Sequence, residues 1–350
     1  MSIYTNLKNA VMIRKMICIA VCAWMCASCE KNDGGVFEPV EPPVEKPEEP
    51  TTPLSIEDLF TIKINDEVMA VVGTNDWRAI AYGNGQYVAY GYTSNESSKR
   101  WVSTSVDGIT WTTPKSANIR FSRIIFANGK FVGVDSINSI ATSTDGLNWT
   151  IRETNVPSGT GAFHPTDVAY GNGKLVVISR DSGYFATSLD GLTWNIQKNN
   201  NMSGMYAITY ANDMFVVCGN KAVYTSENGE TWTVSKVDEF IVDQKYGWGC
   251  TQWAGIVYGN GKLVAAGSDG MAGFVWVSED GINWSAPTKM SNVNWYDIVY
   301  SNGLFVVCGS NGYISFSTDG MTWTTKEKVK DEAGNTISSF LYGIVAMPAK

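Results

Sequence analysis

The chain has 350 residues, of which 44% are hydrophobic, so it can bury the core of one large or two ordinary domains. Its 34 acidic residues outnumber 26 basic ones, which gives a formal charge of -8. Residues 1–28 hold three of the bases and no acid, so the rest of the chain carries 23 bases against 34 acids, or -11. A surface this acidic repels phosphate backbones, and we expect no nucleic-acid partner.

The N-terminus has the pattern of a targeting segment. Arg14 and Lys15 precede the apolar run MICIAVCAWMCA, which is too short to span a bilayer and is typical of a signal peptide. The run ends at Ala27-Ser28-Cys29, which resembles the lipobox of bacterial lipoproteins. That resemblance implies removal of residues 1–28, lipidation of Cys29 and anchoring to the outer membrane, facing the periplasm or the cell surface. A soluble secreted protein with ordinary cleavage is the alternative.

Residues 29–53 differ in composition from the rest of the chain. They include VFEPVEPPVEKPEEPTTP, in which proline removes backbone donors and the glutamates repel one another, so we predict an extended tether. The acids close behind Cys29 resemble signals that send lipoproteins to the outer face of the membrane. The globular domain is then expected at residues 54–350.

Cysteine and histidine usage argues against a metal centre in this domain. Cys218, Cys250 and Cys308 are an odd number without CxxC spacing, which favours small buried hydrophobes over disulfides. The single histidine, His164, leaves both a zinc site and a histidine-rich catalytic centre without enough ligands. We expect no metal and no cofactor.

A β-prone pair of runs opens the domain, and a repeat follows it. Residues 60–64 and 67–72 flank Asn65-Asp66 and predict a hairpin. From residue 77 onward a box of the form S-x-D/N-G-x-x-W occurs six times. Its tryptophans are Trp111, Trp149, Trp194, Trp232, Trp284 and Trp323, at spacings of 38, 45, 38, 52 and 39 residues.

Each repeat contains four short β-prone runs. In the first unit these are RAIAYG, QYVAYG, RWVSTS and TWTTP. Asn-Gly joins the first two runs and Asp-Gly the last two, and both dipeptides are typical of two-residue type I′ hairpins. Four antiparallel strands in about 40 residues is the blade of a β-propeller, so we predict an all-β fold of this kind.

The number of blades depends on how the two ends of the repeat are interpreted. Residues 341–346 repeat the start of a unit, and the hairpin at 60–72 could supply outer strands for the same blade. We therefore predict seven blades, the last closed by strands from both termini, which leaves no exposed edge. Six blades with a decorated end is the alternative.

The S-x-D-G-x-x-W box resembles the Asp-box, or BNR repeat, of sialidases and related propellers, over about residues 77–325. In such families the box lies on the outer hairpin of each blade, remote from the ligand site. Serine and aspartate oxygens can accept hydrogen bonds from turn amides, glycine supplies positive φ and tryptophan covers the hairpin. One or two acids per turn do not make a calcium cage, so we interpret the box as structural.

The variable loops lie on the face opposite these turns, where binding is expected. The residues just before each first strand should ring the mouth of the central channel and combine aromatic with polar groups, as a glycan or peptide ligand requires. The first residue of each triplet is expected to pack between blades, and the others are better ligand candidates. The predicted ligand-binding residues are Trp77, Arg78, Arg123, His164, Asp167, Tyr206, Trp253, Trp295, Tyr296, Asp297 and Tyr342.

Two longer loops, 152–167 and 237–255, add to the same face, and the second is rich in aromatic residues. Sialidase-like propellers use three arginines and a Tyr–Glu pair for catalysis, and this sequence supplies neither set at the mouth of the channel. A glycoside hydrolase or lyase would need two carboxyl groups, for which Asp167, Asp181 and Asp297 are weak candidates. We therefore expect a monomeric, membrane-anchored and non-catalytic propeller that binds a glycan or a partner protein. A glycosidase or lyase, and an assembly scaffold for another envelope protein, are the alternatives.

Overall fold

The computed structural model divides into two units at residue 54, and the residues that it describes all belong to the unit 55–350. It describes residues 75–93, 100–108, 110–135, 139–154, 163–180, 183–219, 222–236, 241–243, 248–249, 252–301, 303–330, 334, 336, 338 and 340–345. The expected signal peptide, Cys29, the tether, the hairpin at 60–72 and Asp181 lie outside these residues. Across the described ranges, no helix has the length and hydropathy needed to cross a membrane.

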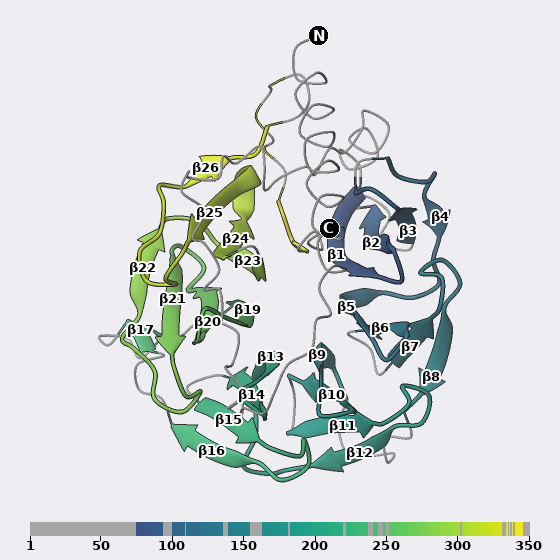
Figure 1. Ribbon diagram of the computed structural model, residues 1–350, viewed down its shortest axis with the longest axis horizontal. Helices are drawn as coiled ribbons and strands as arrows, with labels where there is room; N and C mark the ends of the chain where they lie inside the picture. The colour runs from purple at the N-terminus through teal and green to yellow at the C-terminus, as the bar shows by residue number, and fades with distance from the viewer. Residues whose placement is uncertain are drawn as a thin grey trace, which may run out of the picture. The chain divides into compact units, whose positions relative to one another are not determined.

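Six four-stranded antiparallel sheets surround a central axis, each built from consecutive strands (Figure 1). The inner strands are β1 (Asn75–Gly83), β5 (Phe121–Ala127), β9 (Pro165–Gly171), β13 (Met205–Ala211), β19 (Gln252–Gly259) and β23 (Trp295–Ser301). The second strands are β2 (Gln86–Thr93), β6 (Lys130–Asp135), β10 (Lys174–Ser179), β14 (Met214–Gly219), β20 (Lys262–Ser268) and β24 (Leu304–Gly309). The third strands are β3 (Arg100–Ser105), β7 (Ser139–Ser143), β11 (Tyr184–Ser188), β15 (Ala222–Ser226), β21 (Gly273–Ser278) and β25 (Tyr313–Ser317). The outer strands are β4 (Lys115–Ser116), β8 (Thr150–Glu153), β12 (Asn195–Lys198), β16 (Thr233–Lys236), β22 (Thr288–Ser291) and β26 (Glu327–Lys328).

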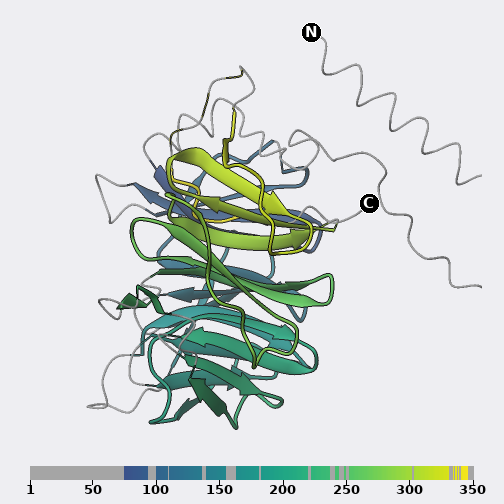
Figure 2. The ribbon, with the colours of Figure 1, turned by 90° about the vertical axis from the view of Figure 1, so that its left-hand side faces the viewer.

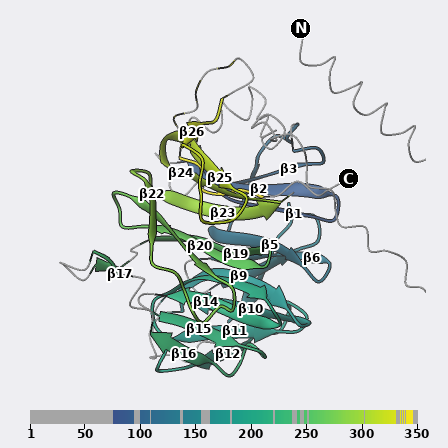
Figure 3. The same ribbon diagram turned by 60° about the vertical axis from the view of Figure 1, so that its left-hand side comes forward.

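The fold is a six-bladed β-propeller, and we number the blades 1 to 6 along the chain. Six blades is the alternative that the sequence left open, and the prediction of seven is not confirmed. Residues 341–345 carry no strand pairing, and the other expected strands of a seventh blade lie outside the described residues. Two elements add to the blades. The 3-10 turn Ser310–Gly312 joins β24 to β25, and β17 (Ile241–Asp243), which pairs with β18 (Trp248–Gly249), projects from one side (Figures 2 and 3).

The Asn-Gly turns between first and second strands are type I′, as predicted. Asn84 and Gly85 have φ of 49° and 77°, and the pairs at 128–129, 172–173 and 260–261 repeat these values closely. Asn212 and Asp213 do the same with φ of 49° and 59°, without a glycine. Asparagine tolerates the left-handed region, so the turn is kept even there.

The Asp-Gly turns between third and fourth strands differ from the prediction, because they are not two-residue hairpins. Six residues separate β7 from β8 (144–149) and nine separate β21 from β22 (279–287). Only the glycine has positive φ, 70° at Gly146 and 76° at Gly281. The box tryptophan lies in this connection rather than in the fourth strand.

Side-chain hydrogen bonds replace strand pairing in these long turns. In blade 2, Gly146 N donates to Ser143 Oγ at 2.8 Å, and Asn148 N donates to Asp145 Oδ1 at 2.8 Å. Trp149 Nε1 closes the turn on Gly146 O at 2.9 Å. Blade 4 has Asn228 in the aspartate position, and its Oδ1 accepts the same amides. An acceptor oxygen is therefore sufficient and a negative charge is not required.

The same turns join each blade to the one before it. A Cβ added at Gly146 would lie 2.2 Å from Val88 on β2, and Gly229, Gly281 and Gly320 meet a valine of the preceding second strand in the same way. Side chains beside the Asn-Gly turns then donate to turn carbonyls of the next blade. These bonds are Gln86 to Asp145 O, Asn128 to Leu189 O, Lys174 to Asn228 O, Asn212 to Glu279 O and Asn260 to Thr318 O. Both kinds of turn therefore share one face of the ring, which we call the turn face.

Inner strands also pack closely where the preceding blade provides a glycine. A Cβ added at Gly171 would lie 1.9 Å from the ring of Tyr210 in the next blade. Gly83 and Gly259 meet Phe126 and Tyr300 similarly. Where the preceding residue is alanine (Ala127 or Ala211), the next aromatic, Tyr170 or Tyr258, is 39% exposed. One methyl group thus decides whether the ring lies between the blades or turns outward.

The core consists of layers between successive blades rather than a single centre. One cluster joins Val216 and Cys218 of blade 4 to Ile256, Leu263 and Trp276 of blade 5, all 0–5% exposed. Cys218 and Cys308 are buried, as predicted for small hydrophobic positions.

Gly171→Ala should lower the free energy of unfolding by about 1–3 kcal/mol, because its methyl group overlaps the ring of Tyr210. We expect a lower thermal midpoint and a more exposed Tyr210, measured by calorimetry and tyrosine solvent-perturbation spectra. Ala127→Gly is the control, since it adds backbone freedom without overlap and should cost about 1 kcal/mol or less. An unchanged midpoint for Gly171→Ala would contradict this account of the packing.

Asp280→Asn should make the fold less sensitive to acid. Burial raises the pKa of Asp280, but hydrogen bonds from Asn283 and Ile282 outweigh it and hold the pKa at about 2, below its ordinary 3.8. A carboxylate whose pKa is lower in the folded state stabilises the fold above about pH 4, and loses this effect as the pH falls towards 2. The variant copies Asn228, so we expect it to fold at pH 7 and to lose less of its thermal midpoint between about pH 5 and pH 2.5.

Glu279→Gln is the matched control for Asp280→Asn. It removes one charge from the same turn, and the Glu279 side chain takes no part in the hydrogen bonds that the structure describes in this turn. If both variants change acid sensitivity equally, overall charge and not the turn network is responsible.

Candidate functional site

Every inner strand carries a β-bulge at the face opposite the turns, which we call the mouth face. The register slips by one residue at the second position of each expected triplet, for example between Trp77 and Ala79 and between Trp295 and Asp297. A bulge frees one residue from the ladder and redirects its side chain. The bulged residues are Arg78, Ser122, Thr166, Tyr206, Ala254 and Tyr296.

Two of the bulged side chains bind the next blade. Ser122 Oγ is 3.4 Å from Pro165 O, and Thr166 Oγ1 donates to Met205 O at 3.0 Å. Ala254 is small and buried. The large bulged residues that remain at the mouth are Arg78, Tyr206 and Tyr296, each half-buried.

Arg78 and Tyr296 meet the C-terminal segment in an aromatic cluster. The Arg78 guanidinium lies 3.6 Å from the centre of the Tyr342 ring and 4.7 Å from that of Tyr92. The rings of Tyr296 and Tyr342 are 4.8 Å apart, and Phe340 lies 5.8 Å from Tyr342 with 47% of its surface exposed. We call Arg78, Tyr92, Tyr296, Phe340 and Tyr342 the seam cluster, because it joins blade 1 to blade 6.

Positive charge gathers on the blade 1 side of the seam cluster. Arg120 is exposed and lies 5.6 Å above the Tyr92 ring. Arg100 on β3 pairs with Tyr92, and its Nη1 donates to Asn118 O at 3.2 Å. In a chain of net charge -8, three arginines thus lie beside the aromatic rings of the seam cluster.

Asp167 and Asp297, the expected catalytic candidates, are brought together by Arg123 rather than held apart for chemistry. Arg123 Nε donates to Asp167 Oδ1 at 3.0 Å, and Nη1 donates to Asp297 Oδ1 at 2.9 Å. The other carboxylate oxygens accept backbone amides of Ile208 and Ile344 at 3.0 and 2.9 Å. Burial lowers the pKa of Arg123, but Asp297 and Asp167 outweigh it and raise this pKa above the ordinary arginine value.

This triad changes the interpretation of three predicted ligand residues. Asp167 and Asp297 are 4% and 3% exposed, and their oxygens are occupied by Arg123 and backbone donors. General acid–base work needs a carboxyl within reach of the substrate, which neither provides here. The triad instead links blades 2, 3 and 6 across the centre of the ring.

The first residues of the triplets pack between blades, as expected. Trp295 is fully buried, and Trp253 lies 4.9 Å from Trp276 in the core of blade 5. Trp77 holds the same position of the repeat in blade 1, and it is half-buried. Direct ligand contact by Trp295 would require the blade to open, so this residue has a packing role.

His164 is tied to the scaffold by its backbone. Its amide donates to Ser179 Oγ at 3.0 Å, and its carbonyl accepts from Arg180 N at 3.1 Å. The part of the chain that the structure describes holds no cluster of three or more histidine, cysteine or acidic side chains able to bind a metal ion.

Phe340 and Tyr92 belong to the seam cluster but were missed, because both lie outside the aligned triplets.

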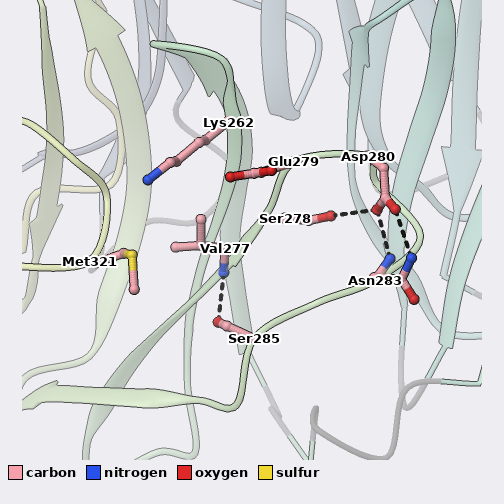
Figure 4. A pocket seen from close by; sticks show the side chains of 8 residues that line it. All are labelled: Lys262, Val277, Ser278, Glu279, Asp280, Asn283, Ser285 and Met321. Carbon is pink, nitrogen blue, oxygen red and sulfur yellow. Dashed lines mark hydrogen bonds between the residues drawn. The ribbon is translucent and has the colours of Figure 1, made fainter.

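A shallow cavity of about 350 Å³ lies on the turn face, between blades 5 and 6 (Figure 4). It is lined by Lys262, Val277, Ser278, Glu279, Asp280, Asn283, Ser285 and Met321. Asp280 and Asn283 are already bonded to each other at 2.7 Å within the box turn. The cavity is therefore a gap beside a structural turn, and it lacks the convergent polar groups of a ligand site.

Arg123→Met should destabilise the fold by about 3–5 kcal/mol, because it leaves two buried carboxylates without their cation. Urea unfolding followed by tryptophan fluorescence gives the free energy. The triple variant Arg123→Met, Asp167→Asn, Asp297→Asn should recover most of the loss, since it removes all three charges together. If the triple variant is as unstable as the single one, unpaired charge is not the cause.

No protein-family model and no curated protein matches the chain. Among solved structures it is similar to virginiamycin B lyase from Staphylococcus aureus, at 14% identity and a TM-score of 0.58, over 74% of this chain and 86% of the lyase. It is also similar to YCF48 bound to D1 peptide, at 18% identity and a TM-score of 0.50, over 75% of this chain and 82% of that one. YCF48 from Cyanidioschyzon merolae follows at 15% identity and a TM-score of 0.49, over 73% and 85%. The chain therefore shares its β-propeller fold with YCF48 and with a lyase.

Proposed function

We propose that the chain is a non-catalytic binding module that holds a segment of a partner protein at the seam cluster. One observation carries the proposal: Tyr296 and Phe340 pack against Tyr342, the Arg78 guanidinium lies over the Tyr342 ring at the mouth, and Phe340 is 47% exposed. Partly exposed aromatic and arginine side chains are the residue types that dominate protein-binding energies.

A protein segment fits this cluster better than a glycan. Sugar sites usually offer an open ring face, whereas the Tyr342 face is occupied by the Arg78 guanidinium at 3.6 Å. The exposed side chain of Phe340 suits contact with apolar side chains of a protein segment. YCF48, a propeller of similar fold, has been solved bound to D1 peptide, and this analogy agrees with the choice of a protein segment.

The catalytic alternatives have less support. A glycoside hydrolase needs carboxyls that reach the substrate, and Asp167 and Asp297 are engaged by Arg123. The fold likeness to virginiamycin B lyase does not carry its activity across at 14% identity. An envelope assembly scaffold is a special case of the protein-binding proposal rather than a rival.

The cellular setting remains part of the proposal. The lipobox-like Ala27-Ser28-Cys29 supports a lipid anchor at Cys29, and the acidic tether supports display away from the membrane surface. We propose a monomeric outer-membrane lipoprotein, related in its turn motif to Asp-box propellers, whose mouth face is free to meet a partner.

Panning a displayed library of random extended peptides against the full chain tests this function. We expect enriched peptides whose affinity falls about tenfold or more in Arg78→Ala and Tyr296→Ala, because both lie in the seam cluster. Tyr258→Ala is the matched control, since Tyr258 is 39% exposed but lies on the turn face. Binding should be unaffected by it.

A glycan array is screened in parallel with the peptide library. Glycan binding that depends on Tyr296, in place of peptide binding, would support the glycan alternative. Failure to enrich any ligand, or equal effects of all three substitutions, would contradict the proposed site.

A further inference from the structure

The seam between blades 6 and 1 differs from the other five. At those five, the inner strands of consecutive blades lie side by side, from β1 and β5 to β19 and β23. Between β23 and β1 lie residues 340–345, drawn as a short segment without strand pairing (Figure 1). The glycine of the blade 1 turn, Gly108, meets Tyr87 of its own blade instead of a valine from the blade before.

Residues 340–345 occupy the position of an inner strand with respect to blade 6. Ile344 N donates to Asp297 Oδ2 at 2.9 Å. Between blades 3 and 4, Ile208 N donates to Asp167 Oδ2 at 3.0 Å in the same arrangement. Leu341 N also donates to Gly309 O at 3.1 Å, and the Cys308 thiol donates to Leu341 O at 3.3 Å.

The segment has the same relation to blade 1 ahead of it. A Cβ added at Gly343 would lie 3.3 Å from Ile80 Cγ2. A Cβ added at Gly255 of blade 5 would lie 3.1 Å from Ile298 Cγ2 of blade 6. Gly343 and Gly255 align in the repeat, as do Ile80 and Ile298. The segment therefore makes the same contacts with blades 6 and 1 that an inner strand makes with its neighbouring blades.

The two sides of this position are less covered than the rest of the ring. Five of the aligned apolar residues are 2–5% exposed: Ile124, Val168, Ile208, Ile256 and Ile298. The two beside the seam, Ile80 and Ile344, are only half-buried, and so is Leu341. A segment lies there in the position of an inner strand, but the outer strands of a blade that would cover it are missing from the described residues.

We propose that residues 340–345 are the inner strand of a seventh blade, and that residues 60–72 of the same chain dock on it to complete that blade. Only residues 73 and 74 separate this segment from β1 at Asn75, which borders the seam. Its two runs alternate β-prone residues around Asn65-Asp66, as a hairpin requires. A half-buried segment in the position of an inner strand is also a suitable partner for added strands.

This docking has a consequence for the seam cluster, and that consequence rests on the proposed function. Phe340 and Tyr342 come from the closing segment, whereas Arg78 and Tyr296 come from blades 1 and 6. Residues 60–72 would hold the segment in place, so closing the ring would also assemble the binding cluster.

Hydrogen–deuterium exchange on the full chain tests the closure without any ligand. We expect the amides of 60–72 and of 341–345 to exchange at least about tenfold more slowly than in an unstructured peptide. Met69→Pro should abolish both protections and lower the thermal midpoint, because proline cannot pair within a strand. Thr52→Pro is the matched control, since it places the same residue in the proline-rich tether.

The outcomes separate this closure from the binding function. Rapid exchange of 60–72 and 341–345 in the unmodified chain would overturn the closure and leave the position open to a strand from another protein. Protection that survives Met69→Pro would overturn the assignment to residues 60–72. Peptide binding that is lost while protection is kept would instead count against the proposed function alone.

Discussion

From blade 2 onward, the contact between the Ser-x-Asp/Asn-Gly turn and the blade before it is the constraint on which this propeller depends. The turn glycine has to lack a side chain, because a methyl group at Gly146 would meet Val88 at 2.2 Å. The turn carbonyls must also point outward to accept Gln86, Asn128 and their equivalents. Serine and aspartate hold that conformation by bonding to the turn amides. Repetition of the motif is thus explained by repeated assembly, without any role in chemistry.

Because the turn face is committed to assembly, variation is left to the mouth face. Each inner strand begins there with a bulge, and the bulged residue is free to differ between blades. Ser122 and Thr166 use this freedom for contacts with the next blade, whereas Arg78 and Tyr296 present larger groups. The Arg123 triad closes the centre with charges that are already paired. In the proposed function, recognition is then left to the seam cluster.

Local rules explain what could be predicted from the sequence, and long-range contacts explain the rest. Asn-Gly dictates its own type I′ geometry, so the first hairpins of blades 1, 2, 3 and 5 follow the prediction in detail. Asp-Gly was misread as the same turn, because the bonds that open it come from Ser143 and Trp149, several residues away. Nothing in the repeat indicates that Arg123 would reach Asp297, 174 residues later, and neutralise two candidate acids. Phe340 was missed since it precedes the aligned triplet and is recognisable only by its exposure.

The closing seam shows why function gathers where the repeat ends. Identical blades make identical contacts, and a ring of identical contacts offers a partner no distinct site. The last contact has to be made by chain ends, whose residues are not bound by the repeat. Here Tyr342 aligns with the bulged residues Ser122 and Thr166 of other blades, and it meets Arg78 where those residues bond to a carbonyl of the next blade. The break in symmetry therefore places at the seam a set of side chains that the repeat does not produce elsewhere in the described blades.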